Sequence, residues 1–200
     1  MEDNNKHIEL NRYQDGTPSA MRKPTVYTGL HFYRKSDVLV QLTKAFCGRF
    51  LPRYGDRTVD QMTQAARSGK QNIVEGSTAA TTSAETHIKL LNVAKASFHE
   101  LLMDYEDYLR VRELVQWKEN DAKFIQTRKV CASHNESEYY RNAIKSRTPE
   151  TIANIAITLL HQEDYLLLRL IEKAKSQFLE TGGIREQMTK ARINYRNKKD

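Results

Sequence analysis

A helical segment lined with small residues places the strongest constraint on the fold of this 200-residue chain. Over residues 59–76, small and apolar residues recur at steps of three and four, which puts them in one stripe along a helix. The stripe contains Val59, Met62, Ala66, Gly69 and Ile73, with Ala65 beside it. Because Ala65, Ala66 and Gly69 are short, a second helix can approach closely. Gly76 suits a left-handed C-cap, so we expect the helix to end there.

Capping patterns mark where this helix and the one before it begin. Ser36 is a favoured N-cap, and the periodicity after it predicts a first helix over residues 36–51. Pro52 and Gly55 break that helix. Thr58 opens a capping-box pattern, so we expect the second helix to begin there.

Two longer helices follow. Residues 77–83 are small and polar, which indicates a loop, and Thr82 opens a second capping box. The apolar seam that follows continues to about residue 112, a length of roughly 45 Å. The last long helix begins with Thr148 as its cap and Pro149 as its first residue, and a pair of glycines at 182–183 stops it.

The pattern as a whole predicts an all-α protein, an up-down four-helix bundle, since no segment shows the alternation of a strand. The bundle covers residues 36–180. Residues 116–148 form an insert of one or two short helices. Residues 1–35 form a flexible N-terminal arm, and residues 181–200 form a basic suffix that is either a short helix or a disordered tail.

The net charge of +7 lies outside the main helices. Residues 36–115 and 149–180 together carry 13 basic and 15 acidic residues, whereas the suffix carries six basic and two acidic residues. The insert carries seven basic and four acidic residues. A basic appendage on a nearly neutral scaffold suits phosphate binding, although a solvated surface has the same composition.

Composition also bears on the compartment. No apolar run approaches the roughly 18 residues of a membrane span, and the first residues lack the pattern of a signal peptide. Two cysteines, Cys47 and Cys131, do not make a disulfide framework. We therefore expect a cytoplasmic protein without membrane contact.

The motifs of common catalytic and metal sites are missing from the sequence. His99 and Glu100 begin like a zinc-protease helix, but the second histidine is replaced by Met103. Glu85 is followed by Ile88 rather than by the histidine of a ferritin-like site. We expect no enzymatic activity, no metal and no cofactor; an enzyme would need carboxylates or histidines that converge from different helices.

Asn72 and Glu75 form a polar pair near the expected end of the second helix. Such a pair makes either a solvent or capping contact, or a hydrogen-bond network at a seam between subunits. The first interpretation is favoured on the sequence alone.

The motif around this pair resembles a known family. The runs Gln64-Ala-Ala-Arg-Ser68, Asn72-Ile-Val-Glu-Gly76 and Ala94-Lys-Ala-Ser97, with Glu100-Leu101, are similar to the four-helix-bundle proteins of ribosomal-RNA intervening sequences. That family includes the accessory variability determinants of diversity-generating retroelements. The ending after Gly182 resembles the four-helix-bundle suffix subgroup.

The resemblance implies a homo-oligomer, such as a pentameric ring, that contacts nucleic acid or a ribonucleoprotein, with a reverse transcriptase as partner in the retroelement branch. It also assigns a motif or interface role to six residues, namely Ala65, Ala66, Gly69, Asn72, Glu75 and Gly76.

Our functional hypothesis is a non-catalytic accessory protein that binds RNA or DNA through the suffix. The contact residues would be Arg185, Lys190, Arg192, Arg196, Lys198 and Lys199, with Tyr195 stacking on a base. The alternative is a structural protein–protein interaction module, in which the suffix docks an acidic partner and nucleic acid has no role.

Overall fold

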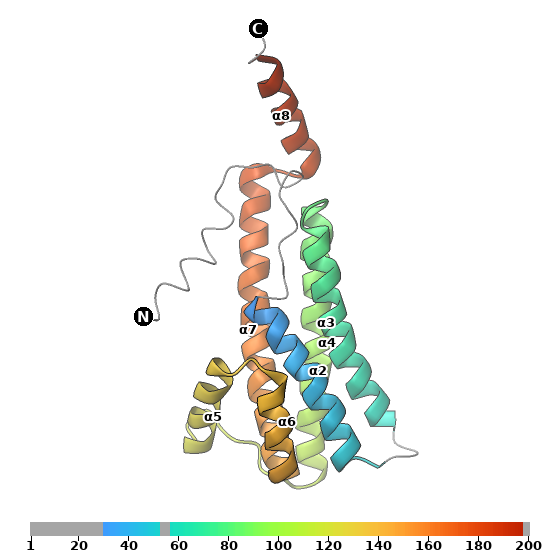
Figure 1. Cartoon of the computed structure of the whole chain (residues 1–200), viewed down its shortest axis with the longest axis vertical. Coiled ribbons are helices and arrows are strands. Elements are labelled where there is room, and N and C mark those ends of the chain that lie inside the picture. Colours follow the sequence, from blue (N-terminus) through green and yellow to red (C-terminus); the bar gives the residue numbers. More distant parts are fainter. Residues whose placement is uncertain (1–29, 53–56, 198–200) are drawn as a thin grey trace.

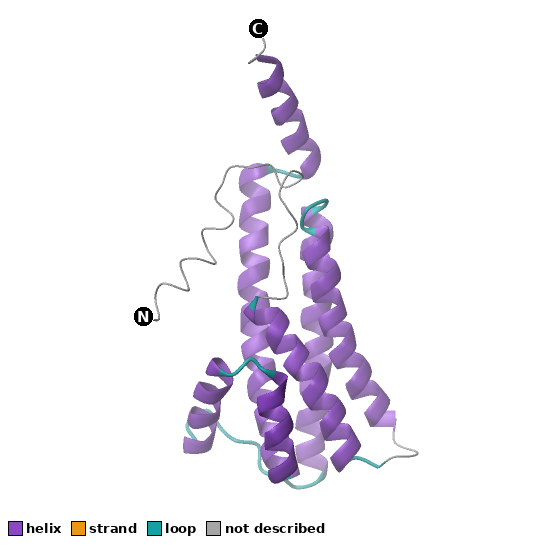
Figure 2. Cartoon of the chain, in the orientation of Figure 1, coloured by secondary structure: helices purple, strands orange, loops and turns teal. Residues whose placement is uncertain are grey.

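The structure, a computed structural model, describes residues 30–52 and 57–197. In these ranges the chain forms helices joined by loops and no strand, which confirms the predicted all-α class (Figure 2). The helices are α2 (His31–Phe50), α3 (Arg57–Ala79), α4 (Ala84–Val111), α5 (Ala122–Ser133), α6 (Ser137–Ser146), α7 (Pro149–Thr181) and α8 (Ile184–Asn197). The predicted insert thus contains two short helices, α5 and α6.

The helix α3 packs on both α2 and α4, and α7 also packs on both α2 and α4 (Figure 1). The most extensive contact is between α3 and α4, followed by that between α4 and α7. The short helix α6 packs on α2, and α5 packs on α7. The last helix, α8, extends beyond the far end of α7 (Figure 1).

The core lies between the four long helices, each of which contributes fully buried side chains. They include Leu39 and Phe46 of α2, Met62 and Ile73 of α3, Leu91 and Leu101 of α4, and Ile152 and Leu159 of α7. Tyr105 is also fully buried, and its hydroxyl donates to Thr43 Oγ1 over 3.1 Å. That bond satisfies a polar group which would otherwise be costly to bury.

The first helix begins earlier than its capping pattern predicted. α2 starts at His31, so Ser36 lies inside the helix and caps nothing. Its buried hydroxyl donates to the Tyr33 carbonyl oxygen over 2.7 Å, a local bond that satisfies serine within a helix. Thr58 likewise lies within α3 rather than before it, while Gly55 falls outside the described residues.

The prediction that Gly76 ends the second helix is wrong. α3 continues to Ala79, and Gly76 lies buried against α4. A Cβ atom at Gly76 would lie 3.3 Å from Leu90 Cβ and 3.5 Å from the His87 carbonyl oxygen. His87 Nδ1 lies 2.7 Å from the Gly76 carbonyl oxygen. The glycine therefore allows close approach of two helices rather than a left-handed turn.

The loop between α3 and α4 is correspondingly shorter than predicted. Its capping residue is Ser83, whose Oγ accepts from the Thr86 amide over 3.1 Å, rather than Thr82. The start of α7 is as predicted, because Thr148 Oγ1 accepts from the Thr151 amide over 3.2 Å. Gly182, with φ of 74°, ends α7 in a conformation that favours glycine.

Candidate nucleic-acid interface

The suffix predicted to bind nucleic acid forms the helix α8, and side chains at its first turn fix the joint with α7. Glu186 Oε2 accepts from the Gly183 amide over 2.6 Å, as the acidic member of a capping box does. Gln187 Nε2 donates to the Gly182 carbonyl oxygen over 2.9 Å and to Thr181 Oγ1 over 3.0 Å. These bonds hold the start of α8 against the end of α7.

Three arginines of the suffix lie on one face of α8. Arg185, Arg192 and Arg196 follow one another at steps of seven and four, so they fall within about 40° around the helix axis. All three are exposed. From the first to the last, they cover roughly 16 Å along the axis, which is the rise of about five nucleotides in one strand of a duplex.

The other predicted contact residues are placed differently. Lys190 lies about 140° from Arg185 around the axis, so it is on the opposite face of α8. Tyr195 is 69% exposed and lies about 60° from Arg192, at the edge of the arginine face, where a base could stack on its ring. Lys198 and Lys199 lie outside the described residues.

An apolar stripe runs beside the arginine face. Ile184, Met188, Ala191 and Tyr195 follow at steps of four, three and four, which gives α8 an amphipathic character. None of the α8 residues is buried. An isolated helix of this length is marginally stable in water, so a partner on this helix would stabilise it.

The family-motif residues lie in the scaffold rather than in the candidate interface. Ala65, Ala66 and Gly69 are buried on α3, and Gly69 faces Phe98 of α4. A Cβ atom at Gly69 would lie only 2.6–2.8 Å from three ring atoms of Phe98, so no larger residue fits there without a shift of the ring. The expected close approach of a second helix is therefore present.

Asn72 takes part in a network between α3 and α4. Its Nδ2 donates to the Ser68 carbonyl oxygen over 2.8 Å and to Ser68 Oγ over 3.3 Å. Ser68 Oγ lies 3.0 Å from Ser97 Oγ of α4. Glu75 is exposed and accepts from Gln71 one turn earlier. Neither residue caps a helix, because α3 continues to Ala79.

A buried polar cluster that we did not predict from the sequence joins α2, α5 and α7. Lys35 Nζ donates to the Cys131 carbonyl oxygen over 2.8 Å and to Gln162 Oε1 over 3.0 Å. Glu163 has no exposed surface, and neither carboxyl oxygen has a hydrogen-bond partner in the described structure. The sequence spacing indicates the burial of Glu163, since this residue lies four residues from both Leu159 and Leu167 on the apolar seam of α7.

Burial dominates the electrostatics of this cluster. Desolvation raises the pKa of Glu163 well above its usual value, although the Lys35 charge opposes the shift. Desolvation also lowers the pKa of Lys35 and raises that of the Cys131 thiol to about 11. The thiol is therefore a poor nucleophile at neutral pH, since the thiolate is the reactive form.

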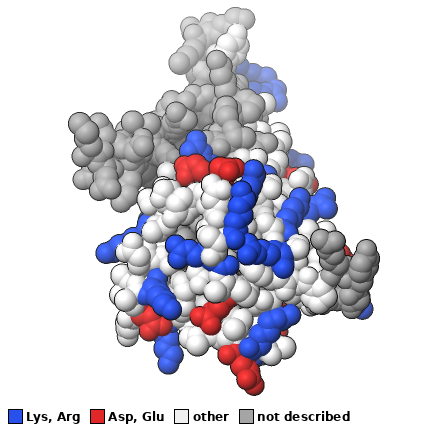
Figure 3. Space-filling view, turned by 60° about the horizontal axis from the view of Figure 1, so that its bottom comes forward, with Lys and Arg blue, Asp and Glu red and all other residues white. Residues whose placement is uncertain are grey.

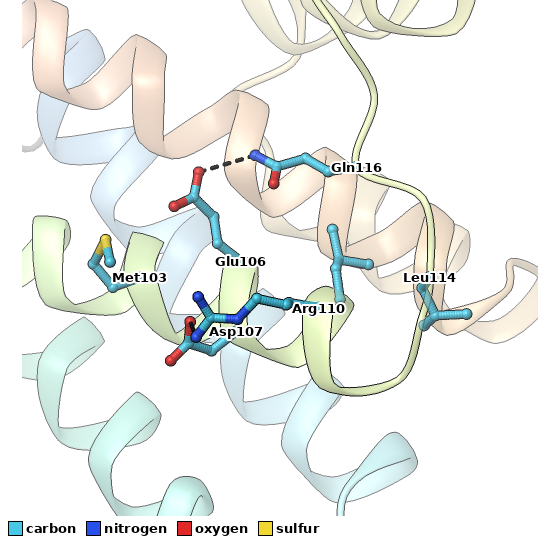
Figure 4. A pocket seen from close by; sticks show the side chains of 7 residues that line it. Met103, Glu106, Asp107, Arg110, Leu114 and Gln116 are labelled. Carbon is cyan, nitrogen blue, oxygen red and sulfur yellow. Dashed lines mark hydrogen bonds and ion pairs between the residues drawn. The ribbon is translucent and has the colours of Figure 1, made fainter.

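A cavity of about 290 Å³ lies at the C-terminal end of α4 (Figure 4). Its charged groups already have partners within the cavity: Asp107 pairs with Arg110 at 2.6 Å, and Glu106 accepts from Gln116 over 2.9 Å.

No helix in the described part of the chain is both long and apolar enough to cross a bilayer. Nor does any group of three or more His, Cys, Asp or Glu side chains gather there in a way that could hold a metal ion. Comparison of the chain with protein-family models, with curated proteins and with solved structures finds no match.

Proposed function

We propose that this protein is a non-catalytic, oligomeric helical protein that binds RNA or DNA through the arginine face of α8, as an accessory subunit of a ribonucleoprotein. One observation carries the proposal. Arg185, Arg192 and Arg196 are exposed on the same face of a projecting helix, and none of them pairs with a carboxylate of the described residues. Cations in such an arrangement are available to phosphates.

The scaffold of this proposal is an up-down four-helix bundle formed by α2, α3, α4 and α7, with α5 and α6 as its insert. Exposed apolar side chains on two of these helices support self-association: Val93 and Met103 on α4, and Tyr165 and Leu168 on α7. An oligomer, such as a pentameric ring, would present several copies of α8, and multivalency raises affinity without new contacts. A reverse transcriptase is the partner that the family resemblance suggests.

The proposal is tested by removing one cation from each face of α8. Arg192→Ala should weaken binding to a single-stranded oligonucleotide and reduce the slope of log affinity against log salt by about 0.7, the value for one phosphate contact. Lys190→Ala is the matched control, because it removes a cation from the opposite face of the same helix. Equal effects of the two variants, or no effect of either, would contradict a contact at the arginine face.

The amphipathic character of α8 favours a second candidate function, a protein–protein interaction module. Here the stripe of Ile184, Met188, Ala191 and Tyr195 docks on a partner protein and the arginines contact acidic residues at its rim. Protein purified at low salt without excess absorbance at 260 nm, together with an unmeasurable affinity for oligonucleotides, would favour this alternative over nucleic-acid binding.

A further inference from the structure

The end of the molecule opposite α8 carries a second group of cations. Three helices end there, namely α2, α4 and α6 (Figure 1). Arg49, in the last turn of α2, donates from Nη1 to the Ile144 carbonyl oxygen in the last turn of α6. The bond joins Arg49 to the segment of chain that continues with Lys145 and Arg147, both of which are exposed.

A series of aromatic rings connects Arg49 to a fourth cation. The Arg49 Cζ atom lies 5.1 Å from the centre of the Phe50 ring, and Phe50 lies 5.3 Å from Phe46. Phe46 in turn lies 4.8 Å from Tyr108 of α4, whose ring is covered by Arg112 at 4.1 Å. Arginines held against ring faces keep their position, and their outward N–H groups stay available for an anion.

We call Arg49, Arg112, Lys145 and Arg147 together the basal surface. Within the described residues, none of the four pairs with a carboxylate, in contrast to neighbours such as Arg110. Figure 3 brings this end forward and shows Lys and Arg side chains distributed across it, with fewer Asp and Glu.

The ends of the helices do not balance this charge. A helix C-terminus contributes about half a negative charge, so three of them offset roughly 1.5 of the four positive charges. Glu106 and Glu150 at the same end accept hydrogen bonds from Gln116 and from the Val115 amide, and neither pairs with any of the four cations. The four cations therefore stay available to phosphate.

We infer that the basal surface binds the phosphate backbone of the same nucleic acid as α8, an inference that rests on the proposed function. The two surfaces lie at opposite ends of α7, which is 33 residues or roughly 50 Å long. At 3.4 Å per nucleotide this distance corresponds to about 15 nucleotides. A strand of about 30 nucleotides can reach both surfaces of one protomer, whereas one of six nucleotides contacts a single surface.

The experiment compares variants of the full chain in binding to a 30-nucleotide single strand across a salt series. The double variant Lys145→Ala/Arg147→Ala should reduce the slope of log affinity against log salt by about 1.4, and Arg192→Ala by about 0.7. Lys89→Ala, which removes an exposed cation from the N-terminal half of α4, is the control and should change neither affinity nor slope. Arg49 is left intact because its guanidinium also holds α6.

The outcomes separate the two proposals. If only Arg192→Ala reduces the slope, the basal surface does not bind nucleic acid and the proposed function stands. If only the double variant reduces the slope, α8 does not bind nucleic acid and the inference about the basal surface is supported. If neither variant differs from Lys89→Ala, both proposals are wrong. Thermal unfolding of each variant provides the structural readout, because a change in slope at an unchanged melting temperature reports a lost phosphate contact.

Discussion

Replacement of Glu163 by glutamine should make the protein more stable, and the gain should grow with pH. In the folded protein this carboxyl has no exposed surface and no hydrogen-bond partner among the described residues. Ionisation therefore places a charge in a medium that solvates it poorly, and the Lys35 charge compensates for only part of that cost. Glutamine keeps the shape of the side chain and cannot ionise.

The direction and size of this change in the free energy of unfolding follow from proton linkage. Because the pKa of Glu163 is raised in the folded state, the folded protein binds more protons than the unfolded chain between the usual value of 4.5 and the raised pKa. In that window the free energy of unfolding of the wild type falls by about 1.4 kcal/mol with each pH unit, as far as this group is concerned. Glutamine at this position does not titrate, so the variant does not lose this stability. The difference in free energy of unfolding between the variant and the wild type therefore grows with pH until the pH exceeds the raised pKa of Glu163.

The assay is urea unfolding of wild type and Glu163→Gln at half-unit pH steps from 4.5 to 8. Other titrating groups, such as Asp104, whose pKa is raised to about 6, are common to both proteins and cancel in the difference. Glu172→Gln, which makes the same replacement at an exposed position of the same helix, is the control for the substitution itself. A difference between wild type and Glu163→Gln that does not vary with pH would refute the reasoning.

Three further predictions concern packing, capping and reactivity. Gly69→Ala should be less stable than Gly48→Ala by about 1–3 kcal/mol in urea unfolding, since a Cβ atom overlaps Phe98 at the first site and meets nothing within 4 Å at the second; equal stabilities would contradict the close helix approach. Thr148→Ala should cost about 1 kcal/mol through loss of the α7 cap, whereas a cost near zero would show that the cap is dispensable. Cys131 should react with a thiol reagent at pH 7.5 only after unfolding, and rapid modification of the native protein would contradict its burial.

The long helices could be predicted because their apolar periodicity and their capping residues indicate the same structure. α4 and α7 have sustained apolar seams, and the cap of α7 has both threonine and proline in the favoured positions. Gly76 could not be assigned correctly, because a glycine that ends a helix and a glycine that admits a neighbour look the same in sequence. The structure distinguishes the two, because Leu90 of α4 packs directly against Gly76.

The candidate interfaces differ in how much the sequence reveals. The cations of α8 stand together in the chain, so their cluster is visible, although the separation of Lys190 from the arginines appears only once the segment is a helix. The basal surface gathers residues from α2, α4 and the end of α6, which are far apart in sequence. The packing of these helices brings them to one end of the molecule, where Arg49 bonds to Ile144 and Arg112 stacks on Tyr108.

The central claim is that the arginine face of α8 binds nucleic-acid phosphates, and the salt dependence of binding by the full chain tests it most directly. Three phosphate contacts predict that log affinity for a single-stranded oligonucleotide falls against log salt with a slope of about −2 or steeper. A slope near zero, or no binding at about 50 mM salt, where such contacts are strong, would contradict the claim.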